Sequence, residues 1–367
     1  MRFPPATQAL LDRHGFDEAR FAAQRASLAR AGFDPGLALV AGPVESVAAD
    51  ALFECPAPDK GLRDAHEARG LEALRRGEVA LVMLAGGMAT RFGGVAKACS
   101  PCLEGQSFLQ LRLSHLARQR AELGLDVPVA LMTSFATEAA ISAHLAEHAR
   151  FGLAERDVLC FGQGISVRLT PEGEPFLEDD GAPSLYAPGH GDLPWAMARA
   201  GVTQTLRARG VRTLFVCNVD NMGANVDPAV LGAHLALGAP MSAETVGRLP
   251  TDVGGGAARI GGRDQLVEGF RLPQGVDHQR LLGFNTNTFY LSVAALDPAR
   301  PAAFHPVAKQ VSGRRAVQFE RILGELSEHL DCRFLQVSRE LRTGRFLPVK
   351  TPEDLRALVP VLEARYR

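Results

Sequence analysis

The stretch Val79-Ala80-Leu81-Val82-Met83-Leu84-Ala85-Gly86-Gly87-Met88-Ala89-Thr90-Arg91-Phe92-Gly93-Gly94 joins an apolar run to a loop with four glycines. The apolar part has the length and composition of a buried β-strand. Glycines after such a strand let backbone N–H groups approach an anion, and Arg91 and Lys97 add positive charge. The spacing fits neither the P-loop nor the dinucleotide pattern G-x-G-x-x-G. The stretch therefore predicts a phosphate-binding turn, with a plain glycine-rich turn as the alternative.

Apolar runs alternate with amphipathic segments from residue 79 onward, and this alternation predicts an α/β fold with a parallel sheet covered on both faces. Such sheets bind ligands beyond the carboxyl ends of their strands. The earlier sequence, rich in Ala, Arg and Glu, predicts a helical N-terminal extension over residues 1–75, which leaves 76–367 as the main domain. We expect strands at 79–84, 127–132, 213–217 and 345–349, and helices at 108–123, 138–148, 195–209, 319–330 and 352–365.

The composition excludes several classes of protein. Hydrophobic residues make up 46% and charged residues 22% of the 367 residues, which is typical of a globular protein. Lys and Arg number 40 against 41 Asp and Glu, so no overall field favours nucleic acid or an anionic membrane. The N-terminus has no signal-peptide pattern, and six scattered cysteines do not form a disulfide framework. We therefore expect a cytoplasmic protein with reduced thiols and no nucleic-acid or membrane partner.

The glycine-rich loop resembles the signature loop of sugar-nucleotide pyrophosphorylases, and the resemblance continues in order to the end of the chain. It is to the family of eukaryotic-type UTP–glucose-1-phosphate uridylyltransferases and UDP-N-acetylhexosamine pyrophosphorylases. The further motifs are Leu131-Met132-Thr133-Ser134-Phe135, Phe161-Gly162-Gln163, Pro188-Gly189-His190-Gly191-Asp192, Phe215-Val216-Cys217-Asn218-Val219-Asp220-Asn221, Leu266-Val267-Glu268, Phe284-Asn285-Thr286-Asn287-Thr288, Val317-Gln318-Phe319-Glu320 and Arg345-Phe346-Leu347-Pro348-Val349-Lys350-Thr351.

The resemblance implies a Rossmann-like nucleotidyltransferase (GT-A-like) fold with a mixed, mostly parallel sheet, the catalytic domain being 76–367. It implies a uridylyltransferase that joins UTP to a hexose 1-phosphate, with Mg²⁺ held by Asp220. Glucose 1-phosphate is the favoured acceptor, and N-acetylglucosamine 1-phosphate or a broad range of sugar phosphates are alternatives. The oligomeric state is not predicted.

The resemblance also assigns residues to the two substrates. The residues that would stabilise the charge that develops on the phosphates during the transfer are Lys97, Asp220, Lys350 and Arg91. The nucleotide would contact Leu84, Ala85, Gly86, Gly87, Lys97, Gln163 and Gly189. The sugar phosphate would contact His190, Asn218, Asp220, Gly256, Glu268, Asn285, Asn287 and Lys350. Without the resemblance, these assignments have structural alternatives. Asp220 would equally well cap a turn, Asn285 and Asn287 would be turn residues, and His190 would be a structural histidine.

Several positions depart from the family pattern. Ala89 replaces a glycine, which would cost about 1 kcal/mol if this residue had a positive φ. Gly254 stands where glucose enzymes often carry lysine, Thr133 replaces an asparagine, and the sequence ends where glucose-specific relatives continue into a β-helical tail. A non-catalytic regulator that binds UTP or a UDP-sugar is therefore a second hypothesis.

Two further motifs do not belong to this assignment. His144, Glu147 and His148 match the H-x-x-E-H pattern of a zinc protease, but we expect a solvated helix face because no third protein ligand of that kind is evident. Cys99 and Cys102 have C-x-x-C spacing without the second pair of a zinc site. We expect these two small residues to have no special role. The alternative is that oxidation of the two thiols deforms the glycine-rich loop.

Overall fold

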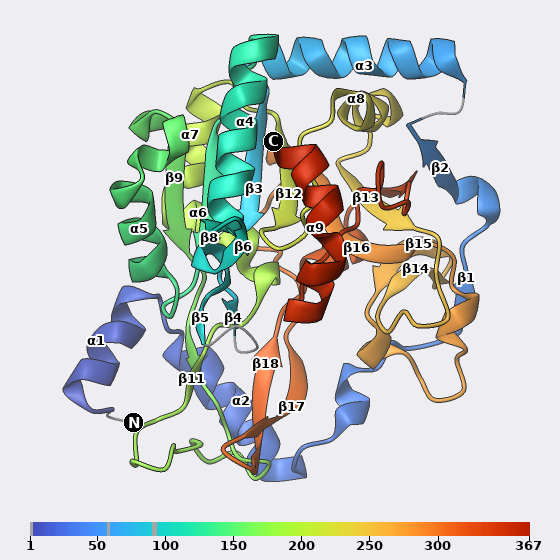
Figure 1. Cartoon of the computed structure of the whole chain (residues 1–367). Coiled ribbons are helices and arrows are strands. Elements are labelled where there is room, and N and C mark those ends of the chain that lie inside the picture. Colours follow the sequence, from blue (N-terminus) through green and yellow to red (C-terminus); the bar gives the residue numbers. More distant parts are fainter. Residues whose placement is uncertain (1–2, 57–58, 90–93) are drawn as a thin grey trace.

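A mixed, mostly parallel β-sheet forms the centre of the molecule, as the sequence predicted (Figure 1). The computed structural model describes residues 3–56, 59–89 and 94–367. In this part of the chain the sheet has 11 strands. Its main path runs through β2 (Leu52–Cys55), β19 (Cys332–Val337), β13 (Met241–Val246), β16 (Phe284–Ser292), β12 (Thr213–Asn218), β3 (Val79–Leu84), β8 (Val129–Thr133) and β9 (Val158–Gly162). β16 is antiparallel to both of its neighbours on this path, and the other pairs are parallel.

The strand β3 shows how the sheet obtains two covered faces. Leu81 and Met83 belong to one hydrophobic core, whereas Ala80 and Val82 belong to the other, as the two-residue period of a strand requires. The first core also contains apolar residues of α3 (Lys60–Arg75), α4 (Phe108–Leu123), α5 (Glu138–Glu147), α8 (Pro228–Leu237) and α9 (Pro352–Tyr366). The second core contains those of α6 (Leu193–Arg199) and α7 (Val202–Ala208).

The N-terminal segment is mostly helical, but it also contributes to the sheet. Leu11 of α1 (Pro5–Arg13) and Leu28 of α2 (Glu18–Ala31) pack in a small core with Val317 of β18 (Arg314–Glu320). Figure 1 shows α2 beside the hairpin of β17 (His305–Val311) and β18 at the lower end of the molecule. The sequence did not predict β1 (Val44–Ser46) or β2, which pair with β14 (Gly256–Ile260) and β19.

Short strands complete the fold. β14 pairs with β15 (Arg263–Val267) and extends the main sheet beside β16. The remaining two-stranded pairs are β4 (Met88–Ala89) with β5 (Val95–Ala96), β6 (Pro101–Leu103) with β7 (Gln106–Ser107), and β10 (Ser166–Val167) with β11 (Leu185–Tyr186).

Three predicted elements differ from the structure. The helix expected at 195–209 is two helices, α6 and α7, separated at Gly201, which has φ +71°. The helix expected at 319–330 is wrong, because 314–320 pair with β17 and only a 3₁₀ segment, Leu323–Glu328, follows. The strand expected at 345–349 is also wrong, since this segment makes a single bridge, from Pro348 to Asn221. Among the described residues, no helix is both long and apolar enough to cross a bilayer.

Candidate active site

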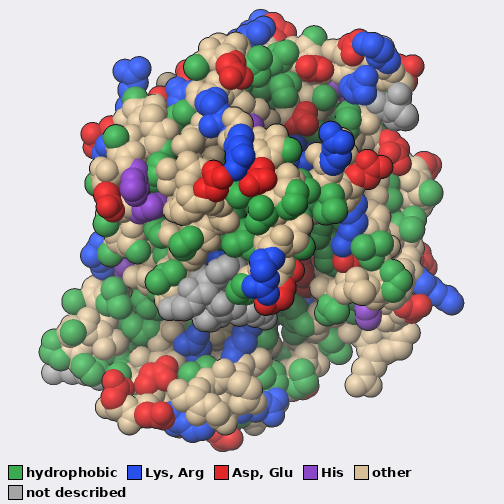
Figure 2. All heavy atoms as spheres, viewed as in Figure 1, with side chains coloured by type: hydrophobic (Ala, Val, Ile, Leu, Met, Phe, Trp, Pro, Cys, Tyr) green, Lys and Arg blue, Asp and Glu red, His purple; other side chains and the backbone are tan. Residues whose placement is uncertain are grey.

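Two cavities of about 370 and 350 Å³ open side by side at the carboxyl ends of the central strands. They share four lining residues, Gly189, His190, Asn218 and Asp220. Figure 2 shows a hollow in the molecular surface below the residues drawn in grey, with basic side chains inside it. A ligand in either cavity would therefore meet a ligand in the other at these four residues.

The first cavity lies where four parallel strands end. Leu84 ends β3, and Gly86 and Gly87 come just after it. Met132 is the last residue but one of β8, Gln163 follows β9, and Asn218 ends β12. These residues come together because parallel strands place their carboxyl ends at one edge of the sheet. Ala85, predicted with them, is buried beneath the cavity, where its carbonyl accepts a hydrogen bond from Thr137.

Among the described residues that line the first cavity, Lys97 carries the positive charge. This side chain is buried, and its Nζ lies 4.6 Å from the centre of the Phe108 ring. Arg91, the other predicted cation of the loop, lies outside the described residues. Ala89 pairs with Val95 in an extended strand, so the positive φ that would have strained an alanine does not occur there.

Gln163 and Gly86 form one wall of the first cavity. A Cβ atom on Gly86 would lie 2.1 Å from Gln163 Nε2, so only glycine leaves room for this amide. The Gln163 Oε1 atom is buried and has no hydrogen-bond partner among the described residues. An acceptor of this kind is costly unless a ligand donates to it.

His190 is held as a neutral donor between the cavities. The backbone N–H of Leu323 donates to His190 Nδ1 at 3.1 Å, so the proton of the neutral ring is on Nε2. Burial lowers the pKa of His190 to about 4. Gly189, just before it, has φ +103°, and a Cβ there would lie 2.7 Å from the Arg321 carbonyl oxygen. The backbone at Gly189 therefore requires glycine.

Asp220 follows β12 and lines both cavities. Burial raises the pKa of its carboxyl, and the charges of Lys97 and Lys350 oppose this shift. Lys350 is exposed and lines the second cavity. Oxygen donors of Asp220 and Asn218 beside the glycine-rich loop fit a hard divalent cation, because Mg²⁺ is usually held by one or two carboxylates together with phosphate oxygens.

The second cavity is lined by many polar side chains, among them the carboxylate of Glu268 and the amides of Asn285 and Asn287. Asn285 Nδ2 donates to Glu268 Oε1 at 3.2 Å, and Asn287 Nδ2 donates to Asn218 Oδ1 at 3.0 Å. Burial raises the pKa of Glu268, and the hydrogen bond from Asn285 opposes this shift. The Asn287 Oδ1 atom is buried without a partner in the part of the chain that the structure describes.

Asn285 and Asn287 both lie on β16, and the regular geometry of this strand is interrupted near them. Asn287 has φ +56°, and the register between β13 and β16 shifts between Glu244 and Thr245. Both amides nevertheless line the second cavity. Gly256, a predicted sugar contact, does not line it, whereas Gly254 and Gly255 do. The guanidinium of Arg248 donates to both of their carbonyl oxygens, at 3.4 and 3.0 Å.

Arg112 is a residue that sequence reasoning missed. It is 2% exposed, and it donates to the carbonyl oxygens of Asn218, Asn221 and Ala224 at 3.3, 2.8 and 2.5 Å. It therefore holds the loop that carries Asp220. The only signal in the sequence is an arginine within the apolar face of α4, where its neighbours are Leu109, Leu111, Leu113 and Leu116.

The comparisons with known proteins identify a family and a fold. The sequence model of the family described as UTP–glucose-1-phosphate uridylyltransferase matches residues 56–362. The enzyme of that name from Solanum tuberosum is 28% identical over 322 residues, which cover 83% of this chain and 63% of the relative. The one from Saccharomyces cerevisiae is 29% identical over 298 residues, covering 76% and 58%. The chain thus spans about three fifths of the length of these relatives.

Solved structures show the same fold. The UDP-glucose phosphorylase of Trypanosoma brucei superimposes with a TM-score of 0.76 at 22% identity, covering 97% of this chain and 79% of that one. The UDP-N-acetylglucosamine pyrophosphorylase of the same organism gives 0.74 at 19% identity, covering 95% and 80%. Because the family model matches most of its length, this chain belongs to the UTP–glucose-1-phosphate uridylyltransferase family.

Proposed function

We propose that this chain transfers the uridylyl group of UTP to a hexose 1-phosphate, forming a UDP-sugar and pyrophosphate. The observation that carries the proposal is the junction of the two cavities at His190, Asn218 and Asp220. UTP in the first cavity and the sugar phosphate in the second would meet there with their phosphates in contact. Lys97 and Lys350, whose charges both act on Asp220, would lie around the transferring group.

The first cavity supports a uracil nucleotide. The buried Gln163 Oε1 atom can accept the N3–H of uracil, and Nε2 of the same amide can donate to a ring carbonyl. Leu84, Gly86, Gly87 and Gly189 would let the nucleotide lie against the backbone. The Nε2–H group of His190 would donate to a phosphate oxygen at the junction.

The chemistry needs position and charge more than an acid or a base. The sugar phosphate is largely ionised near neutral pH, because its second pKa is about 6, so it can attack the α-phosphorus of UTP directly. Lys97, Lys350 and Arg91 would neutralise charge on the phosphorus and the leaving pyrophosphate. Mg²⁺, held by Asp220 and phosphate oxygens, would supply further neutralisation of this charge.

The second cavity supports a hexose. Glu268 and the Asn287 Oδ1 atom can accept hydrogen bonds from sugar hydroxyls, and the amide of Asn285 holds the Glu268 carboxylate in place. We favour glucose 1-phosphate, since the curated relatives are named for it. A UDP-N-acetylglucosamine or broad-specificity enzyme is the alternative within the same reaction.

We also propose that residues 76–367 form the catalytic domain, with 1–75 as an extension that supports it. We propose a cytoplasmic location, which the six unpaired cysteines support.

The test is a pyrophosphate-release assay with UTP, Mg²⁺ and a panel of hexose 1-phosphates, with ATP, CTP and GTP as nucleotide controls. We expect release that needs both UTP and one class of sugar phosphate. Binding of UTP without release of pyrophosphate from any sugar phosphate in the panel would contradict the proposed activity. It would favour the hypothesis of a non-catalytic regulator.

A further inference from the structure

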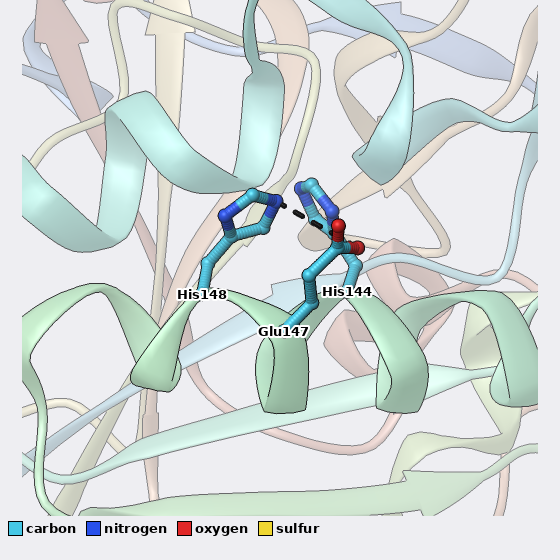
Figure 3. A group of neighbouring side chains, drawn as sticks. All are labelled: His144, Glu147 and His148. Atoms are coloured by element: carbon cyan, nitrogen blue, oxygen red, sulfur yellow. Dashed lines mark ion pairs between the residues drawn. The ribbon is translucent and has the colours of Figure 1, made fainter.

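Three metal-ligating side chains meet on the last turn of α5, away from both cavities. His144, Glu147 and His148 are spaced i, i+3 and i+4, so they lie on one face of the helix (Figure 3). One ligand atom from each lies within 4.8 Å of the other two. None of the three lines either cavity of the candidate active site.

The ring of His144 is oriented by a buried hydroxyl. His144 Nε2 lies 2.7 Å from Ser107 Oγ, and Ser107 is 3% exposed. The hydroxyl is itself fixed, because the backbone N–H of Gln110 donates to it at 3.0 Å. While this contact is kept, Nδ1 is the ring nitrogen available to a metal. In a metal-binding histidine, the ring nitrogen that does not bind the metal usually makes a hydrogen bond to a fixed polar group.

Phe151 holds the two imidazoles together. Its ring stacks on that of His148, with centroids 5.4 Å apart, and its centroid lies 5.3 Å from that of His144. The two histidine rings are 4.7 Å apart. Phe151 reaches this position through a turn in which Ala149, Arg150 and Phe151 all have positive φ. Ligands ordered before binding lose less conformational entropy when an ion arrives.

Glu147 and His148 also lie close to each other. His148 Nε2 lies 4.0 Å from Glu147 Oε2, close enough for both atoms to reach one ion after small side-chain rotations.

We propose that His144, Glu147 and His148 bind one transition-metal ion of the Zn²⁺ class, with water completing the coordination. Two imidazoles and one carboxylate suit Zn²⁺, Co²⁺ or Ni²⁺, whereas Mg²⁺ prefers an all-oxygen set such as that near Asp220. The ion would tie the end of α5 to the turn that follows it. It takes no part in uridylyl transfer, so the proposal is independent of the proposed function.

The test is a Co²⁺ titration of the tag-free full-length protein in the presence of excess Mg²⁺, followed by visible absorption and then by Zn²⁺ competition. We expect one Co²⁺ per chain, with no thiolate-to-cobalt charge-transfer band and full displacement by Zn²⁺. Because the site would bind the folded state, Zn²⁺ should also raise the melting temperature.

Variants separate this site from other ligands. His148→Gln and Glu147→Gln should each weaken Co²⁺ binding by about tenfold or more, and Ser107→Ala should weaken it by about tenfold, as loss of an outer hydrogen bond usually does. The matched controls, His278→Gln at another exposed histidine and Cys160→Ser at an exposed cysteine, should bind as wild type does. Equal binding by wild type and His148→Gln, or no binding by wild type at 100-fold the protein concentration, would overturn the proposal.

Discussion

Gly86 and Gln163 approach so closely that a Cβ atom on Gly86 would lie 2.1 Å from Gln163 Nε2. The two residues come from loops that follow β3 and β9, which are separated in the sheet by β8. Gly86 therefore leaves the space in which the Gln163 amide lies, in addition to the phosphate contact that we propose for its loop.

Gly86→Ala should consequently impair recognition of UTP. The added methyl group must displace the Gln163 amide, which would lose hydrogen bonds to uracil worth about 1–3 kcal/mol, or about a tenfold to hundredfold rise in KM for UTP. Steady-state kinetics measure this effect. Gly61→Ala, at an exposed position of α3 where the nearest described atom to a Cβ is Asp59 Oδ1 at 3.5 Å, is the matched control. An unchanged KM in Gly86→Ala would refute the packing argument.

Asp220→Asn should separate binding from turnover. The amide has nearly the same shape but lacks the charge that would hold Mg²⁺, so kcat should fall by about 100-fold or more. UTP binding, measured by calorimetry without the sugar phosphate, should change by less than about tenfold. Wild-type kcat in this variant would remove Asp220 from the metal site.

Arg112→Lys tests whether the buried guanidinium positions the loop of Asp220. A lysine keeps the charge but cannot reach the three carbonyl oxygens of Asn218, Asn221 and Ala224 together. We expect the free energy of unfolding to fall by about 1–3 kcal/mol and kcat to fall by about tenfold or more at saturating substrates. Arg118→Lys, on the exposed side of the same helix, is the control. A stability loss with unchanged kcat would show that Arg112 is only structural.

The stability of the protein should decrease in mild acid because of buried histidines. Burial lowers the pKa of His234 to about 4, against an ordinary value of 6.5. The unfolded chain therefore binds a proton between these two pH values that the folded chain does not bind, so stability is complete above pH 6.5 and is lost toward pH 4. This residue alone should cost on the order of 2–3 kcal/mol at pH 4.5.

Urea unfolding at pH 7 and pH 4.5 measures this loss. In His234→Gln the decrease between the two pH values should be smaller than in wild type by that amount, whatever the variant's stability at pH 7. His278→Gln, at an exposed histidine, should show the wild-type decrease. The same decrease in His234→Gln as in wild type would contradict a neutral buried His234.

The sequence predicts best what is local. The apolar run 79–84 is continuous and is followed by glycines, and it forms β3 with the predicted bounds. The segment 319–330 carries apolar residues that suit a helix or a strand equally. Its first two residues pair with β17, and Leu323–Glu328 forms a 3₁₀ segment. The positive φ of Asn287 accompanies a register shift between β16 and β13, and no pattern in the local sequence encodes this shift.

The candidate site follows the same rule. Asp220 comes just after the predicted strand 213–217, so it could be placed at the edge of the sheet from the sequence. Gln163 was assigned only by the resemblance, because the strand before it, β9, was not predicted. The roles of Arg112 and Arg248 could not be predicted. Arg112 donates to backbone carbonyls of a loop that is distant along the chain, and Arg248 donates to those of a loop that folds back toward it. The roles assigned to the residues that line the two cavities remain predictions for the experiments above.

The most direct test of the account uses glucose 1-phosphate labelled with ¹⁸O in its three non-bridging phosphate oxygens, incubated with UTP, Mg²⁺ and the wild-type protein. Attack of the sugar phosphate on the α-phosphorus of UTP predicts equal amounts of UDP-glucose and pyrophosphate, with all the label in UDP-glucose. Label in the pyrophosphate, or no UDP-sugar from this or any other hexose 1-phosphate, would contradict it.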